Sequence, residues 1–269
     1  MRSRAARWSI PIIAFVLALP LCSGCAIDKG TALAADFEKH WAGKPDVEKV
    51  EVKGYNTLPF AGLATGVLVL ADGTPPDRVV ERAYELRDYV ARHGSVTGRI
   101  AAGGFTVTVD ADETRTREVM ALWRSLAADQ LVPEGDIHRS VSKIGYRWQV
   151  EVTAVDSAAA MAAFDNLTGG TGPHRPLSDV TSVEVLTRRG ARGGIRVRTD
   201  ANGARPTDAI AAYEAVVAEY PVSGAVLEPA SARIVVAKTT DPDAARELAR
   251  TAAPGLGPAA LTVTVEGGA

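Results

Sequence analysis

The feature that most constrains the fold is a strand pattern that returns about every 40 residues along the chain. Alternating apolar residues, typical of a strand with one buried face, mark five strands. The middle valines of these strands are separated by 40, 43, 45 and 39 residues. They are Val69, Val109, Val152, Val197 and Val236. A period this regular indicates repeated supersecondary units that bury their apolar faces together.

Each marked strand leads into a polar turn and then an amphipathic helix. Acidic residues open several of these helices, as at Asp110-Ala111-Asp112-Glu113 and Asp241-Pro242-Asp243. Such side chains accept hydrogen bonds from the unpaired amides of a first helical turn. A second strand, often joined by a Gly-containing turn, separates each helix from the next marked strand. The sequence therefore predicts helix and hairpin in alternation.

This order of elements resembles the ferredoxin-like plait, in which βαββαβ modules build antiparallel sheets with helices on one face. We therefore expect an α+β protein made of tandem plaits. The first module would cover residues 46–141, the second 142–228, and a C-terminal βαβ half-module 229–269. One continuous sheet with all the helices on one face is the alternative arrangement of the same elements.

Residues 1–24 have the order of a bacterial signal peptide. Arg2, Arg4 and Arg7 form a positive region ahead of an apolar run over residues 10–21. This run is shorter than the ~20 residues that a membrane-spanning helix needs, and two prolines interrupt it. These features favour a targeting segment over a transmembrane helix.

The apolar run ends in Leu21-Cys22-Ser23-Gly24-Cys25, which resembles the lipobox of bacterial lipoproteins. In that motif an aliphatic residue and two small residues precede the cysteine that receives diacylglycerol; here Cys22 stands where leucine is usual. The resemblance implies cleavage before Cys25 and its acylation with fatty acids such as palmitate. Signal-peptidase recognition falls on Leu21, Cys22, Ser23 and Gly24. We expect a lipid anchor on the extracytoplasmic face of the cell membrane, with an ordinary signal peptide as the alternative.

The segment 25–45 joins this anchor to the body of the protein. Leu33, Phe37 and Trp41 recur every four residues, which places them on one face of a helix. A short amphipathic helix is therefore expected. Its apolar face would either pack on the body or lie against the membrane.

Composition excludes several classes of function. The formal net charge is −2 and the basic residues are scattered, so no nucleic-acid partner is expected. Both cysteines, Cys22 and Cys25, lie at the N-terminus, which rules out a disulfide framework, a zinc–thiolate site or a cysteine nucleophile in the body.

Motifs for catalysis and for cofactor binding are missing from the sequence. None of the four histidines is three or four residues from another histidine or a cysteine, so no metal site is predicted. The acidic cluster Asp110, Asp112 and Glu113 is assigned to helix capping. No phosphate-binding loop or nucleophile elbow occurs. We expect no catalytic residues and no cofactor.

One stretch stands out as a possible binding loop. Residues 166–178 are rich in glycine and proline and include His174 and Arg175; a disordered connection is the alternative. The leading hypothesis is a membrane-anchored envelope lipoprotein that binds or scaffolds a protein or cell-wall partner without catalysis. Its alternatives are a tethered enzyme that uses carboxylates converged by the fold, or a structural spacer.

Overall fold

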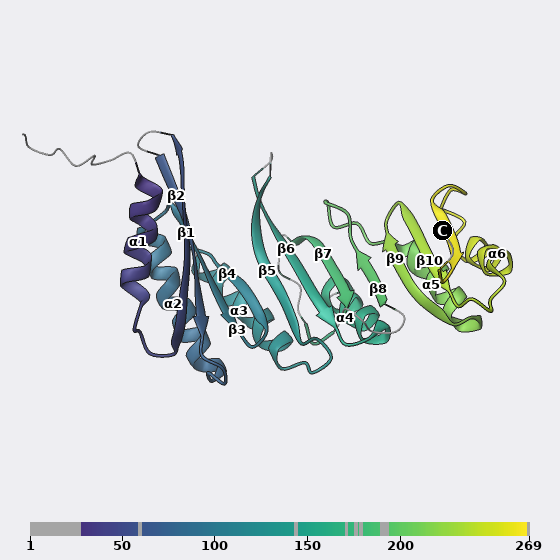
Figure 1. Cartoon of the computed structure of the whole chain (residues 1–269), viewed down its shortest axis with the longest axis horizontal. Helices are drawn as coiled ribbons and strands as arrows, with labels where there is room; N and C mark the ends of the chain where they lie inside the picture. Colours follow the sequence, from purple (N-terminus) through teal and green to yellow (C-terminus); the bar gives the residue numbers. More distant parts are fainter. Residues whose placement is uncertain are drawn as a thin grey trace, which may run out of the picture.

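The computed structural model describes residues 28–58, 61–142, 145–169, 172–174, 177, 180–188 and 194–267. Over these residues the chain forms six α-helices and one sheet of eleven strands (Figure 1). The helices are α1 Lys29–Trp41, α2 Pro76–Arg92, α3 Glu113–Ala127, α4 Ser157–Gly169, α5 Thr207–Glu219 and α6 Pro242–Ala252. The strands are β1 Val47–Leu58, β2 Ala61–Leu70, β3 Val96–Ala102, β4 Phe105–Val109, β5 Glu134–Ser142, β6 Gly145–Ala154, β7 Val180–Thr187, β8 Gly194–Arg198, β9 Val222–Glu228, β10 Ser231–Val236 and β11 Leu261–Val265.

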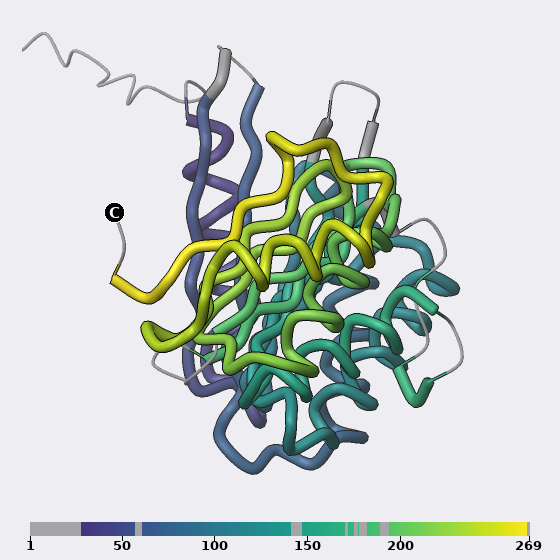
Figure 2. Tube along the Cα trace, turned by 90° about the vertical axis from the view of Figure 1, so that its right-hand side faces the viewer, coloured from purple at the N-terminus to yellow at the C-terminus, as the bar shows by residue number. Residues whose placement is uncertain are grey.

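The strands lie in the sheet in the same order as in the sequence, from β1 at one edge to β11 at the other. Strands joined by a short turn pair antiparallel, as β3 does with β4. Strands joined through a helix pair parallel, as β2 does with β3. The sheet is therefore mixed, and its units follow one another along the long axis of the molecule (Figures 1 and 2).

The prediction of tandem ferredoxin-like modules with antiparallel sheets is wrong. In a plait, a helical crossover passes over one strand position, which a later antiparallel strand then fills. Here each crossover returns to the adjacent position, so that Leu68 of β2 pairs directly with Ile100 of β3. The expected module boundary at 141/142 falls inside β5, and the one at 228/229 falls at the β9–β10 hairpin. The continuous sheet considered as the alternative describes the observed topology.

One face of this sheet is apolar from β2 to β11. The pairing register aligns the buried residues of neighbouring strands, as in the pairs Ile137–Val150, Val150–Val183 and Ile234–Val263. Because burial of apolar area is the main stabilising term, every helix packs on this face. The opposite side of the sheet, which we call the open face, carries the alternating side chains and no helix among the described residues.

Helices on a single face constrain the handedness of the crossovers. The hairpins reverse the strand direction from one crossover to the next, so β2 and β4 run in opposite directions. Both crossovers nevertheless advance in the same sense along the sheet, with their helices on the same side. Alternate crossovers must therefore have the left hand, which is rare in parallel βαβ units.

Helix α1 packs on β1 and β2, with Phe37 and Trp41 fully buried in the core. The backbone of its first turn lies in direct contact with the backbone of β1 and β2. A Cβ atom on Gly30 would lie 2.4 Å from the carbonyl oxygen of Tyr55, and one on Gly62 would lie 2.1 Å from the Gly30 nitrogen. Glycine is required at these two positions, and the N-terminus of α1 is fixed to the far end of the β1–β2 hairpin.

The strand order can be tested by disulfide formation in a chain whose native cysteines are replaced by serine. Val69 pairs with Ala101 on β3, which in turn pairs with Thr106 on β4. Neighbouring strands lie about 4.8 Å apart, whereas the first and third strands lie roughly 10 Å apart, too far for a disulfide. We expect V69C/A101C to oxidise readily and the control V69C/T106C to remain reduced, as measured by thiol titration. A plait would place β4 beside β2, and the reverse result would support it.

Candidate binding surface

The middle strands of the open face, β3 to β9, carry a set of polar and charged side chains. These residues occupy alternate positions, one strand after another, with their neighbours fixed by the register. They are Arg99, Asp136, His138, Gln149, Glu151, Ser182, Glu184, Arg196, Arg198 and Glu228. Because successive side chains on a strand point to opposite faces, burial of the apolar set on the helix side forces this polar set outward.

Three carboxylates form a row across adjacent strands of the open face. Asp136 of β5 lies directly opposite Glu151 of β6, and Glu151 lies opposite Glu184 of β7. Like charges at directly opposed positions are destabilising. This row therefore requires counter-charges, from the protein itself or from a partner.

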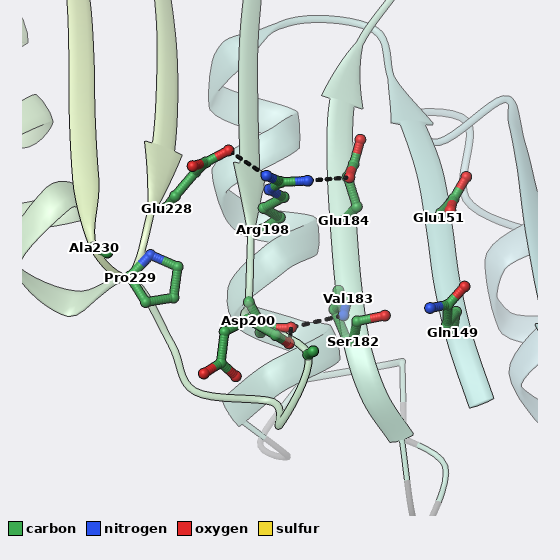
Figure 3. A pocket seen from close by; sticks show the side chains of 12 residues that line it. Gln149, Glu151, Ser182, Val183, Glu184, Arg198, Asp200, Glu228, Pro229 and Ala230 are labelled. Atoms are coloured by element: carbon green, nitrogen blue, oxygen red, sulfur yellow. Dashed lines mark hydrogen bonds and ion pairs between the residues drawn. The ribbon is translucent and has the colours of Figure 1, made fainter. Parts of the chain in front are cut away.

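The protein supplies cations to the two ends of this row. Arg99 forms an ion pair with Asp136, and Arg196 lies 2.7 Å from Glu184. The central residue differs, because Glu151 is exposed and forms no ion pair with an arginine or lysine in the part of the chain that the structure describes; its charge acts on nearby His138, whose pKa it helps to raise. Figure 3 shows its carboxylate on the same strand as Gln149, with no dashed line to the other residues drawn.

His138 completes the polar network beside the row. Its Nε2 lies 2.7 Å from Oε1 of Gln149, and its Nδ1 contacts Oδ1 of Asp136 at 3.3 Å. The contact with Asp136 raises the pKa of His138 above its ordinary value of 6.5 despite partial burial. Burial of the Asp136 carboxyl would raise its pKa, but His138 and Arg99 outweigh this effect and the pKa of Asp136 is lowered. The pair is therefore ionised at mildly acidic pH.

A depression of about 580 Å³ lies on the open face over β6 to β9. Its lining includes Gln149, Glu151, Ser182, Glu184, Arg198 and Glu228 (Figure 3). Arg198 spans its floor, 2.6 Å from Glu228 and 4.0 Å from Glu184. Small-molecule sites are usually enclosed and mostly apolar. This shallow, charged depression is better suited to a larger polar partner.

His174, one of the two residues named for the predicted binding loop, lies on the helix side of the sheet, against α3. Its Nδ1 is 3.1 Å from the hydroxyl of Ser125, and its Nε2 is 3.0 Å from Oδ2 of Asp129. The imidazole side chain is 1% exposed. Both ring nitrogens are therefore engaged inside the protein. Arg175, predicted with it, lies outside the described residues.

Ser125, His174 and Asp129 are the residue types of a hydrolase triad, but their placement argues against that chemistry. Ser125 lies in the last turn of α3, where the negative end of the helix dipole opposes the oxyanion of acyl transfer. Its hydroxyl also donates to the carbonyl of Leu122 at 2.9 Å. The buried imidazole is closed to a substrate. The three residues act as a clamp that ties the segment after α4 to α3.

The acidic cluster assigned to capping lies at the start of α3. The Asp112 carboxylate accepts a hydrogen bond from the amide of Arg115 at 2.7 Å, and Asp110 accepts one from the amide of Asp112 at 2.9 Å. Asp110 also pairs with Arg139 of β5. Over the described ranges, no group of three histidine, cysteine or carboxylate side chains is placed to hold a metal ion.

The lipidation site Cys25 and the motif before it, Leu21, Cys22, Ser23 and Gly24, lie outside the described residues. Among the described helices, none is long and apolar enough to cross a membrane.

The open-face residues were not predicted from the sequence as a binding surface, although their alternation with buried valines was visible in the sequence. Comparison with protein-family models, with curated proteins and with solved structures gave no match.

The His138–Asp136 pair predicts a dependence of stability on pH. A histidine whose pKa is raised by folding stabilises the protein fully below its unfolded pKa, near 6.5, and this contribution is lost as pH rises through the folded pKa. We expect the wild type to lose more stability than His138→Gln between about pH 5.5 and pH 8.5, measured by urea unfolding. Asp136→Asn should return the His138 pKa, followed by NMR, toward 6.5. An unchanged pKa in that variant would contradict the pairing.

The clamp around His174 predicts a loss of stability when the imidazole is removed. His174→Ala leaves the partly buried Ser125 and Asp129 without their partner and opens a cavity, and should cost about 1–3 kcal/mol of unfolding free energy. The matched control is His40→Ala at an exposed histidine, expected to cost no more than about 0.5 kcal/mol. Equal unfolding midpoints for the two variants would exclude the clamp.

Proposed function

We propose that this chain is a lipid-anchored extracytoplasmic binding protein whose open face is the contact surface for a protein partner. The observation that carries this proposal is the continuous sheet, covered by helices on one face and uncovered on the other across the described strands. A sheet of this extent offers a broad surface on a rigid scaffold. Side chains on strands are held in position more closely than side chains on loops.

The charge pattern of the open face supports a protein partner. Acidic and basic side chains lie on adjacent strands, and Arg198 bridges two carboxylates in the depression. The central carboxylate, Glu151, borders both this depression and a smaller one over β5 and β6. Charges arranged in this way provide specificity and orient an approaching partner.

The anchor rests on the motif that ends in Cys25, with its positive and apolar segments in the expected order. A lipid tether keeps a binding protein at the membrane and raises its effective concentration toward other envelope proteins. Helix α1 begins four residues after Cys25, so the folded body would start close to the lipid.

A tethered enzyme is less well supported by the site geometry. Three His–Asp pairs exist among the described residues, but none lies in a deep pocket. The pair Asp36–His93, 3.9 Å apart, joins α1 to the end of α2 and has both side chains partly exposed. The pair Asp136–His138 is on the open face, and the pair Asp129–His174 is closed off by packing against α3. Enzyme sites normally place perturbed titratable groups in a cleft.

The proposal is tested by crosslinking the tagged protein in cells and identifying its partners by mass spectrometry. Glu151→Arg places a cation between Asp136 and Glu184, where it should leave folding intact but reverse the charge that a partner meets. We expect this variant to lose partners that the wild type recovers. Cys25→Ser should lose them too, because the protein is no longer held at the membrane.

The matched control is Glu214→Arg, which reverses the charge of an exposed glutamate on α5, on the helix side of the sheet. It should recover the same partners as the wild type. If Glu151→Arg and Glu214→Arg recover identical partners with melting temperatures equal to the wild type, the open face is not the contact surface.

A further inference from the structure

The far end of the β1–β2 hairpin exposes an apolar pair. Tyr55 and Leu63 lie directly opposite each other on the open face, and their exposed fractions are 42% and 52%. They are two of the four large hydrophobic residues that are exposed among the described residues; the others are Leu131 and Val217. Figures 1 and 2 show this end of β1 and β2 projecting at the edge of the molecule.

This end of the hairpin is fixed to the N-terminus of α1. The side chain of Asn56 accepts a hydrogen bond from the amide of Gly30 at 2.7 Å and donates one to the carboxylate of Asp28 at 3.1 Å. The backbone of Tyr55 also touches Gly30. These contacts therefore hold the end of the hairpin and the start of α1 together.

Cys25 precedes Asp28 by only three positions in the sequence. A fully extended chain spans at most about 3.3–3.6 Å per residue, so the lipidated cysteine would lie within about 11 Å of Asp28. Because Asp28 is bonded to the hairpin, the bilayer surface must pass close to Tyr55 and Leu63.

We propose that Tyr55 and Leu63 form a membrane-contact patch that inserts into the bilayer interface and orients the anchored protein. This inference rests on the proposed lipidation of Cys25. The chemistry of the patch fits an interface: tyrosine concentrates at the level of the lipid headgroups, and leucine adds apolar area. The Lys53 amine lies 5.2 Å from the centre of the Tyr55 ring, where it can reach phosphate groups while its stem follows the apolar surface.

The test uses the full chain, expressed with its anchor and reconstituted in vesicles of phosphatidylethanolamine and phosphatidylglycerol. An environment-sensitive fluorophore is attached at Leu63→Cys in one variant and at Leu131→Cys in the other. Leu131 is a close control because it is 53% exposed and follows α3 at the opposite end of the strands. We expect blue-shifted emission at position 63, quenched by nitroxide-labelled lipids, and neither effect at position 131.

Three outcomes of this experiment would contradict the proposal, and they distinguish a wrong membrane patch from a wrong lipid anchor. Emission at position 63 that is neither shifted nor quenched, from protein that sediments with vesicles and carries labelled fatty acid, overturns the membrane patch alone. Emission that is shifted but not quenched shows that protein rather than lipid covers the patch, and also overturns it. Protein that carries no fatty acid, behaving like Cys25→Ser, overturns the anchor on which the patch depends.

Discussion

The structure depends on one constraint: every strand is apolar on a single face, and all these faces are aligned by the register. Residues such as Leu68, Ile100, Val150 and Ile234 are buried on the same side of the sheet, although they are far apart in sequence. Helices can bury these residues only from that side, which leads to crossovers of alternating hand. Apolar burial of roughly 25 cal/mol per Å² summed over the sheet outweighs the preference of each single crossover for the right hand.

The same constraint produces the open face. Since no helix covers it among the described strands, its side chains face solvent, and those in the middle of the face are largely polar or charged. Exposed ion pairs such as Arg196–Glu184 contribute only about 0–1 kcal/mol each, so the charges are not needed to hold the sheet together. In the proposed function, these charges select and orient a partner.

Local elements could be predicted from the sequence, whereas their arrangement could not. The spacing of Phe37 and Trp41 indicated a helix, and the acidic residues around Asp112 indicated a cap, because both effects act within one or two turns. Strand order was misjudged because the alternation in β2, β3 and β4 is the same whether a crossover reaches the adjacent position or the next one. The partners of His174 lie 45 and 49 residues away, and no local pattern connects them. In the sequence, nothing distinguishes Glu151 from other polar strand residues, because only the strand register places it between two carboxylates.

The direction of the strands relates the proposed anchor at Cys25 to the open face. Helix α1 starts at the end of the sheet where β1 finishes and β2 begins, and the hydrogen bonds of Asn56 fix that end to the first residues of the helix. If the proposed lipid on Cys25 holds this end at a bilayer, the strand axes are directed away from the membrane and the sheet extends along it from β1 to β11. The open face would then be roughly perpendicular to the membrane plane instead of facing it. In that proposed orientation, a partner held in the same membrane would reach the row from Asp136 to Glu184 on the open face without contacting the helical layer.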